Sequence, residues 1–413
     1  MVSKKTVVKF KTLVLAAMLL MADSAQAQPV WTFGQVLHSA LAMHPVVMSK
    51  LSAQDAARAE QKGAEWQRYP TPTIEAARQN GGRDSGLARV EQPIWTSGRI
   101  TAGIDAAGSR LDAADAAVEE AKRDTSLKVI AAYTEALRQK AKQQYAVRGV
   151  EEHEKLLGMI RRRVAQDVSS LADQNLAESR LYLAANDLSL ANQALSNALT
   201  QLSQLSGKPV AEISENGVNG EGTPASLEIA LAQALAYSPT LRRLVFEEEA
   251  ANADIASKRS IYMPTLSLRL EKDLGLLHDS RAMLVLLGQP GAGLSAKYGV
   301  DAAISRRESA SMMREAAERD MRDSVTLDWN EWVAARQRLE NANQTSAKST
   351  QVFESYTRQY VTGRKNWIEV MNAVREATQA QFSVEDARAQ AITAGLRLRA
   401  QAGTLNLNEG TTP

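Results

Sequence analysis

The 413-residue chain contains no cysteine, which excludes disulfide scaffolds, thiolate metal sites, cysteine nucleophiles and lipidated cysteines. Its formal net charge is only +2, which argues against a strongly basic nucleic-acid-binding protein. Mean hydropathy is −0.29, and no apolar run of helix-spanning length follows the N-terminal segment. A polytopic helical membrane protein is therefore excluded as well.

Proline is scarce and unevenly distributed. All 11 prolines lie outside two stretches, 94–208 and 291–412. Proline breaks helix interiors, whereas alanine, which is abundant in both stretches, has the highest intrinsic helix propensity. Both stretches are therefore predicted to form very long helices, unlike those of an ordinary globular domain.

Residues 1–27 are predicted to be a cleaved signal peptide. A lysine-rich start precedes a short apolar core at 13–21, and Ala25-Gln26-Ala27 provides a small-x-small cleavage site. The alternative is an N-terminal membrane anchor, but an apolar run of about nine residues is too short to span a bilayer. The mature chain is expected to begin at Gln28 and to leave the cytoplasm.

Several segments recur in the same order at a fixed spacing, which indicates an internal duplication. The Ala-Leu-Ala-x-x-Pro segment at 40–45 recurs at 234–239, an offset of 194 residues, whereas 104–107 with 300–303 and Gly207 with Gly403 show an offset of 196. We therefore expect two copies of one unit, at 28–222 and 223–405, followed by a C-terminal tail at 406–413.

Each copy is predicted to contain two shorter helices, two strands and two long helices, in that order. The first copy has its strands at about 71–79 and 87–95 and its long helices at about 98–165 and 170–206. The second copy has its strands at about 265–273 and 282–289 and its long helices at about 294–362 and 366–402. The strand pattern is clearest where Leu266, Leu268 and Leu270 alternate with polar residues, as in a strand with one apolar and one polar face.

A helix over 98–165 would be about 100 Å long, and it needs equally long neighbours to bury its apolar stripe. A secreted chain with amphipathic strands and no spanning helix can cross a membrane only as a β-barrel. Strands of about ten residues suit an outer membrane, but four strands cannot close a barrel, because the smallest known barrels have about eight. Several protomers are therefore expected to contribute strands to one barrel.

These features together resemble those of the TolC-like outer-membrane efflux and secretion family, the outer membrane factors. The resemblance is carried by the signal peptide, the duplicated start, the helix breaks Tyr69-Pro70 and Met263-Pro264, the segment 91–99, and the paired Leu171-Ala172-Asp173 and Trp367-Ile368-Glu369-Val370 patterns. It implies a mainly α, internally duplicated protomer with long antiparallel coiled-coil helices and a small membrane β part. Three protomers with four strands each would form a twelve-stranded β-barrel, continued by an α-helical barrel across the periplasm.

The segment 288–296, rich in glycine and proline, is similar to that of the LapE-like branch of the family, which serves type I secretion of large adhesins. A phosphate-binding loop is the competing interpretation of this segment. It is disfavoured because no Gly-Lys-Ser/Thr follows.

The resemblance also implies a periplasmic gate with an acidic ring, at Asp173, Tyr360, Lys365, Glu369 and Asn372. Tyr360 and Lys365 are expected to bond Asp173 across adjacent helices and to hold the pore shut. Three copies of Glu369 would form an anionic ring that favours cations. Lys365 and Asn372 replace the usual arginine and aspartate of the family. Ordinary solvated charge on a helix surface is the alternative for these residues.

The family's adaptor-docking tip falls on two helix–helix turns, which comprise Gln166, Asp167 and Val168 in the first copy and Thr362, Gly363 and Arg364 in the second. Many drug-efflux members carry Val-Gly-Leu at this tip. The departure from that pattern favours a secretion-type adaptor. The alternative is an ordinary polar turn in which Gly363 ends the helix.

Aromatic residues gather at the predicted helix–strand junctions, at Trp66, Tyr69, Trp95 and Tyr262. This is where an aromatic belt would meet the periplasmic membrane interface, although ordinary junction packing is the alternative. Trp329 and Trp332 lie in the middle of a long helix and are predicted to pack between helices.

The leading functional hypothesis is a passive, homotrimeric channel in the Gram-negative outer membrane, which exports a large adhesin or another protein in a type I secretion system. The implied partners are a periplasmic adaptor (membrane fusion protein), an inner-membrane ABC transporter, outer-membrane lipid and the cargo. The alternatives are the outer-membrane component of a tripartite drug-efflux pump and a soluble periplasmic coiled-coil adaptor. No enzyme, cofactor or metal site is expected, because His38, His44, His153 and His278 are scattered and no Gly-x-Ser-x-Gly elbow occurs.

Overall fold

The computed structural model describes residues 30–77, 85–215, 218, 222–274, 279–288, 293 and 295–405. The predicted signal peptide and the C-terminal tail lie outside these residues. So do 289–292 and 294 of the glycine-rich segment, together with the last residues of the strands predicted at 71–79 and 282–289.

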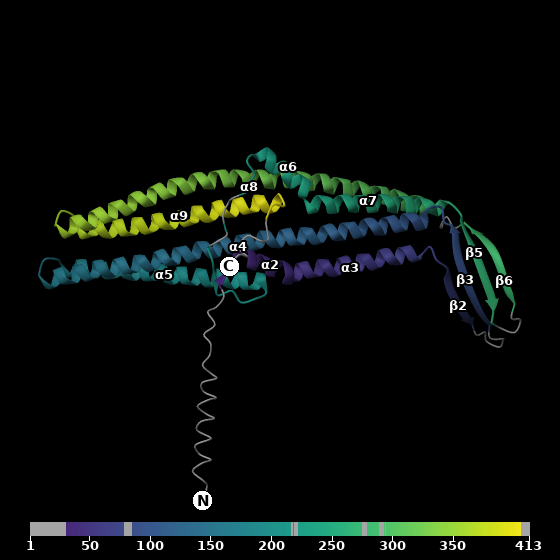
Figure 1. The fold of residues 1–413 in the computed structure, drawn as a ribbon, viewed down its shortest axis with the longest axis horizontal. Helices are drawn as coiled ribbons and strands as arrows, with labels where there is room; N and C mark the ends of the chain where they lie inside the picture. Colours follow the sequence, from purple (N-terminus) through teal and green to yellow (C-terminus); the bar gives the residue numbers. More distant parts are fainter. Residues whose placement is uncertain are drawn as a thin grey trace, which may run out of the picture.

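The described chain is an elongated assembly of long helices with a small sheet at one end (Figure 1). The helices are α2 (Phe33–Met43), α3 (Pro45–Trp66), α4 (Arg99–Ala165), α5 (Leu171–Ser206), α6 (Leu227–Tyr237), α7 (Pro239–Arg259), the 3₁₀ turn η1 (Ser260–Tyr262), α8 (Ser295–Val361) and α9 (Trp367–Gln401). The strands are β1 (Val30–Trp31), β2 (Thr71–Ala77), β3 (Ser85–Trp95), β4 (Glu212–Ile213), β5 (Thr265–Asp273) and β6 (Ser280–Leu287).

The two longest helices, α4 and α8, contain 67 residues each and are therefore about 100 Å long. Each turns back at the far end into a shorter partner, so that α4 with α5 and α8 with α9 form two antiparallel hairpins lying side by side (Figure 1). The mainly helical fold class predicted from the proline distribution is thereby confirmed. None of the described helices is both long and apolar enough to cross a membrane.

The duplication is visible in backbone conformation as well as in sequence. Gly207 follows α5 with φ +67°, and Gly403 follows α9 with φ +70°. Each glycine packs against the last residue of the short helix that opens its own copy, Met43 in one and Tyr237 in the other. The division of the chain into units at residue 222 stays a prediction.

A four-stranded antiparallel sheet, in the order β2-β3-β5-β6, joins the strand pairs of the two copies. Register pairs Val90 with Leu270 and Leu268 with Leu284, so the apolar side chains of neighbouring strands share one face. A bulge follows Pro93 before the sheet gives way to the turn into α4. The expected strand pair is present in both copies, and β2 and β6 form the two edges.

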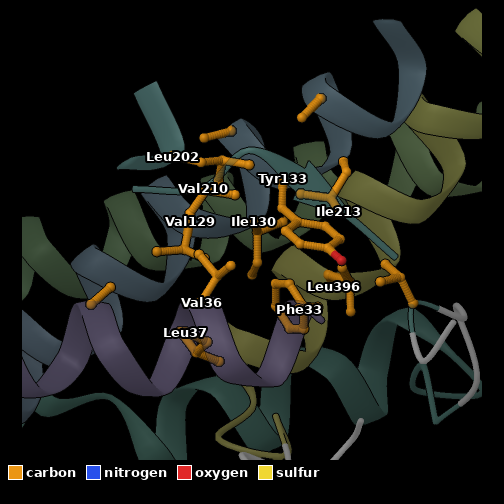
Figure 2. Packing of buried hydrophobic residues seen from close by; sticks show 14 of the residues in the cluster. Phe33, Val36, Leu37, Val129, Ile130, Tyr133, Leu202, Val210, Ile213 and Leu396 are labelled. Atoms are coloured by element: carbon orange, nitrogen blue, oxygen red, sulfur yellow. The ribbon is translucent and has the colours of Figure 1, made fainter. Parts of the chain in front are cut away.

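The main hydrophobic core lies midway along α4, where α2, α5, α9 and the short β1–β4 pair pack around it (Figure 2). Tyr133 is fully buried there, and its ring meets the ring of Phe33 edge-on at 5.5 Å. The Tyr133 hydroxyl lies 2.6 Å from the carbonyl oxygen of Ser214 and 3.0 Å from that of Trp31. One side chain thus connects the long helix to the β1–β4 pair.

The second copy repeats this arrangement on a smaller scale. Ala230 and Ala234 of α6 pack against Val325 of α8 and Leu398 of α9. Trp329 and Trp332 lie against this cluster, with ring centroids 5.1 Å apart. Their predicted role in packing between helices is confirmed.

Candidate functional site

The far ends of the two helical hairpins are built in the same way, although their side chains differ. Asp167 in the α4–α5 turn has φ +56°, and Gly363 in the α8–α9 turn has φ +75°. In the first turn, the N–H groups of Asp167 and Val168 donate to the carbonyls of Val164 and Arg163. The corresponding groups of the second turn make the same two bonds, which is the pattern of a Schellman helix end.

Each returning helix starts with a reciprocal capping box. The hydroxyl of Ser170 accepts a hydrogen bond from the N–H of Asp173, whose carboxylate accepts one from the N–H of Ser170. Asn366 and Glu369 hold the same two positions at the start of α9. The two acidic residues predicted for the gate and its ring therefore also stabilise the helix starts at the tip.

Lys365 is engaged within its own turn. Its ammonium lies 2.6 Å from the Glu369 carboxylate and 4.3 Å from the ring centroid of Tyr356. The hydrogen bond raises the pKa of Lys365 and lowers that of Glu369, to which the Asn366 N–H also donates. Within one described protomer Lys365 makes no ion pair with Asp173, so their predicted bond would have to cross between protomers.

Tyr360 is buried, with 5% of its surface exposed. The guanidinium of Arg163 lies over its ring at 5.0 Å, and its hydroxyl has no hydrogen-bond partner among the described residues. Its predicted bond to Asp173 is therefore absent within the protomer. Asn372 lies exposed on α9, three residues beyond Glu369.

A tightly packed cluster joins the two hairpin ends. It contains Leu156, Leu157 and Ile160 of α4, Ala177 of α5, Tyr360 of α8, and Trp367, Val370, Met371 and Val374 of α9. Trp367 opens α9 and is almost fully buried. The backbone N–H of Ser170 lowers the pKa of Asp173, and the indole of Trp367 lowers it further. The sequence gives no signal for the contacts of Arg163 and Tyr356. Trp367 stands out in the sequence only as part of the paired pattern at the helix starts, and its burial in this cluster was not predicted.

The surface of the tip combines apolar and basic side chains. Val168 in the first turn and Val361 beside the second are 58% and 73% exposed. Gln166, Thr362 and Arg364 are exposed as well. An exposed tip of this kind is compatible with the predicted docking role, which stays a prediction.

The junction between helices and sheet carries the four predicted interface aromatics. Trp66, Tyr69, Trp95 and Tyr262 are all about half exposed or more. Trp66 and Tyr69 contact each other, with ring centroids 4.9 Å apart. The four therefore lie at the junction as expected, and their contact with a membrane stays a prediction.

The two faces of the sheet have opposite chemistry. One face presents exposed apolar side chains from all of its strands, namely Ile74, Val90, Leu268, Leu270, Leu284 and Leu286. The other carries a ladder of paired charges, in which Arg89 lies 2.8 Å from Glu271 and Arg269 lies 3.1 Å from Glu91. Glu91 also accepts a hydrogen bond from Ser267. Such a sheet suits an apolar medium on one side and water on the other.

Three kinds of comparison relate this architecture to known proteins. Residues 36–208 match the sequence model of the outer membrane efflux protein family, and no curated protein sequence matches the chain. Among solved structures, the chain is similar to CusC, with a TM-score of 0.79, 16% identity and coverage of 92% of this chain and 95% of that one.

Two further solved structures show the same likeness. VceC, an outer membrane protein of Vibrio cholerae, has a TM-score of 0.78, 16% identity and coverage of 90% of this chain and 96% of that one. The open MtrE outer membrane channel of Neisseria gonorrhoeae has a TM-score of 0.76, 17% identity and coverage of 92% and 91%. At these identities, the likeness shows that the chains share a fold.

Proposed function

We propose that this chain is a TolC-like outer membrane efflux protein, and that three copies of the chain form a passive channel across the outer membrane and periplasm. The support is a shared fold along its length and a match to the family's sequence model over residues 36–208. Each protomer contributes its four strands to one barrel and its two helical hairpins to a tunnel below that barrel. The chain itself carries out no chemical step on the cargo.

The two-faced sheet is the observation that carries this proposal. Its apolar face is exposed on every strand, with Leu284 and Leu286 each 67% exposed, and lipid would cover it. Its charged face would line a water-filled lumen. The edge strands β2 and β6 run antiparallel to each other. Strand β6 of one protomer can therefore pair with β2 of the next protomer and close a ring of twelve strands.

For the cargo, we favour export of a protein, such as a large adhesin, through a type I secretion system. The support comes from the tip, where Asp167 and Arg364 stand in turns that carry Val-Gly-Leu in many drug-efflux relatives. The partners would be a periplasmic adaptor that contacts the tip and an inner-membrane ABC transporter. The competing function is the outer-membrane component of a drug-efflux pump, which the match to an efflux family favours.

Deletion of the gene, followed by two parallel assays, tests this proposal. We expect the deletion strain to lose a secreted surface protein and to keep its drug susceptibility, and we expect the wild-type gene to restore export. Increased drug susceptibility with unchanged export would favour the efflux pump instead. Recovery of the protein in the soluble periplasmic fraction, with no trimer in detergent extracts of the outer membrane, would contradict both channel functions.

A further inference from the structure

A groove lies between α7 and α8, directly beneath the sheet. Its lining includes Ser97, Ile255, Arg259, Met263, Ile304 and Arg307, and its volume is about 590 Å³. This volume is within the range of pockets that hold organic ligands, and it is far larger than a free inorganic anion needs. We call it the junction groove.

The junction groove is level with the bases of the strands. Ser97 comes two residues after the end of β3, and Met263 comes two residues before the start of β5. The hydroxyl of Ser97 donates to the carbonyl oxygen of Pro264 at 2.8 Å, which ties the two turns together above the groove. If the sheet spans the outer membrane, as proposed above, the groove lies at the level of the headgroup layer of the periplasmic leaflet.

The charge of the junction groove is positive and uncompensated. Arg259 and Arg307 line it, and no aspartate or glutamate does. Neither arginine makes an ion pair with a described residue, and the Nε of Arg307 is buried without a hydrogen-bond partner. A buried guanidinium N–H that lacks an acceptor is unfavourable, so this atom calls for an acceptor from outside the described chain.

Two arginines elsewhere on α4 and α8 are paired with carboxylates. Arg314 of α8 lies 3.0 Å from Glu248, and Arg110 of α4 lies 2.7 Å from Asp254. The junction groove is distinguished by its lining, which brings two arginines together without an aspartate or glutamate.

We propose that the junction groove binds the headgroup phosphate of an anionic phospholipid from the periplasmic leaflet. Arg259 and Arg307 donate to the phosphate oxygens, since guanidinium groups suit phosphate in charge and geometry. Ile255, Met263 and Ile304 supply an apolar surface for the first part of the acyl chains. This inference depends on the proposed channel function, because it needs the sheet to lie in the membrane.

Native mass spectrometry of the purified full-length protein in detergent tests the inference. The titrated probes are phosphatidylglycerol, phosphatidylcholine and inorganic phosphate. The test variant is Arg259→Gln with Arg307→Gln. The matched control is Lys258→Gln with Arg306→Gln, which removes the same charge from adjacent exposed residues that do not line the groove.

We expect the wild type and the control to bind phosphatidylglycerol at least tenfold more tightly than the test variant does, and to prefer it over phosphatidylcholine. Equal binding by the test variant and the control would overturn the inference. So would displacement of the lipid by inorganic phosphate at equal concentration, which would indicate a site for soluble anions. Dissociation of the trimer in the test variant, with lipid binding unchanged, would show instead that a neighbouring protomer occupies the groove.

The same samples distinguish a failure of this inference from a failure of the channel proposal. A trimer from the outer-membrane fraction that shows no preference for phosphatidylglycerol contradicts the lipid site alone. A wild-type protein found only as a soluble monomer contradicts the channel, and the lipid site with it.

Discussion

Asp173 and Glu369 occupy equivalent positions in the two copies, and each closes the capping box that starts the returning helix of its hairpin. The two carboxylates differ in their other contacts. Glu369 is paired with Lys365 at 2.6 Å, whereas Asp173 lies beside the indole of Trp367. The acidic residues predicted for the gate and its ring therefore also cap the starts of the tip helices α5 and α9.

The double variant Asp173→Ala with Lys365→Ala is expected to raise the closed-state conductance several-fold. The reason is that the proposed contact between protomers, from Lys365 to Asp173, would be lost. Single-channel recording in planar bilayers measures this conductance.

Ser170→Ala is the control for that experiment, because it removes the other half of the capping box and keeps the Asp173 carboxylate. Its closed-state conductance is expected to stay close to that of the wild type. A Ser170→Ala channel as leaky as the double variant would show that fraying of α5, rather than a broken gate, causes the leak.

Glu369→Gln is expected to abolish the cation preference of the channel, since the proposed ring would lose its charge. The pKa of Glu369 is lowered by Lys365 and by the Asn366 N–H, so in the wild type the preference should persist through the ordinary glutamate range and disappear only below it. Lys365→Ala removes the hydrogen bond from Lys365 to Glu369, so this variant should lose its cation preference at a higher pH than the wild type does. Reversal potentials across a KCl gradient, recorded between about pH 3.5 and 7, measure the cation preference as a function of pH. The same pH dependence in Glu369→Gln and the wild type would contradict the proposed ring.

Gly403→Ala is expected to destabilise the protein by about 2 kcal/mol or more, because the new methyl group would overlap the ring of Tyr237 in a backbone with positive φ. Gly207→Ala, with the same backbone but more room beside Met43, should cost about 1 kcal/mol. Gly63→Ala, in open space on α3, should be slightly stabilising. Thermal unfolding in detergent gives the order, and a Gly403→Ala protein as stable as Gly207→Ala would refute the predicted overlap.

Tyr133→Phe is expected to lower stability by about 1–2 kcal/mol, because the hydrogen bonds from the Tyr133 hydroxyl to the carbonyls of Ser214 and Trp31 are lost. Burial raises the pKa of Tyr133, so the hydroxyl stays protonated and the loss should be the same at neutral and mildly alkaline pH. The exposed Tyr182 provides the matched control as Tyr182→Phe, with no expected change. An equal loss in both variants, measured by thermal unfolding, would argue against the core role of the hydroxyl.

Most of the helical architecture is predictable because it depends on local chemistry. Proline-free, alanine-rich segments give α4 and α8 bounds within a residue of those expected. The alternation of Leu266, Leu268 and Leu270 similarly gives β5. The capping boxes are encoded locally as well, by Ser170-x-x-Asp173 and Asn366-x-x-Glu369.

The environment of the gate residues could not be predicted in this way. Tyr360 is buried because α4 packs against the end of α8, and Arg163 is about two hundred residues away from it in the chain. The junction groove likewise depends on how α7 and α8 meet the turn at Ser97. Such contacts follow from the relative position of two hairpins, which no local pattern encodes.

The two tip turns share one backbone shape, with Asp167 at the position that Gly363 holds in the other turn. In the proposed trimer, six turns of nearly the same shape would therefore ring the entrance, three with a carboxylate and three with no side chain at that position. The six turns would thus provide two kinds of docking position for an adaptor. Six identical adaptor subunits would therefore bind with two distinct affinities. A complex with only three adaptor subunits would then be a natural intermediate of assembly.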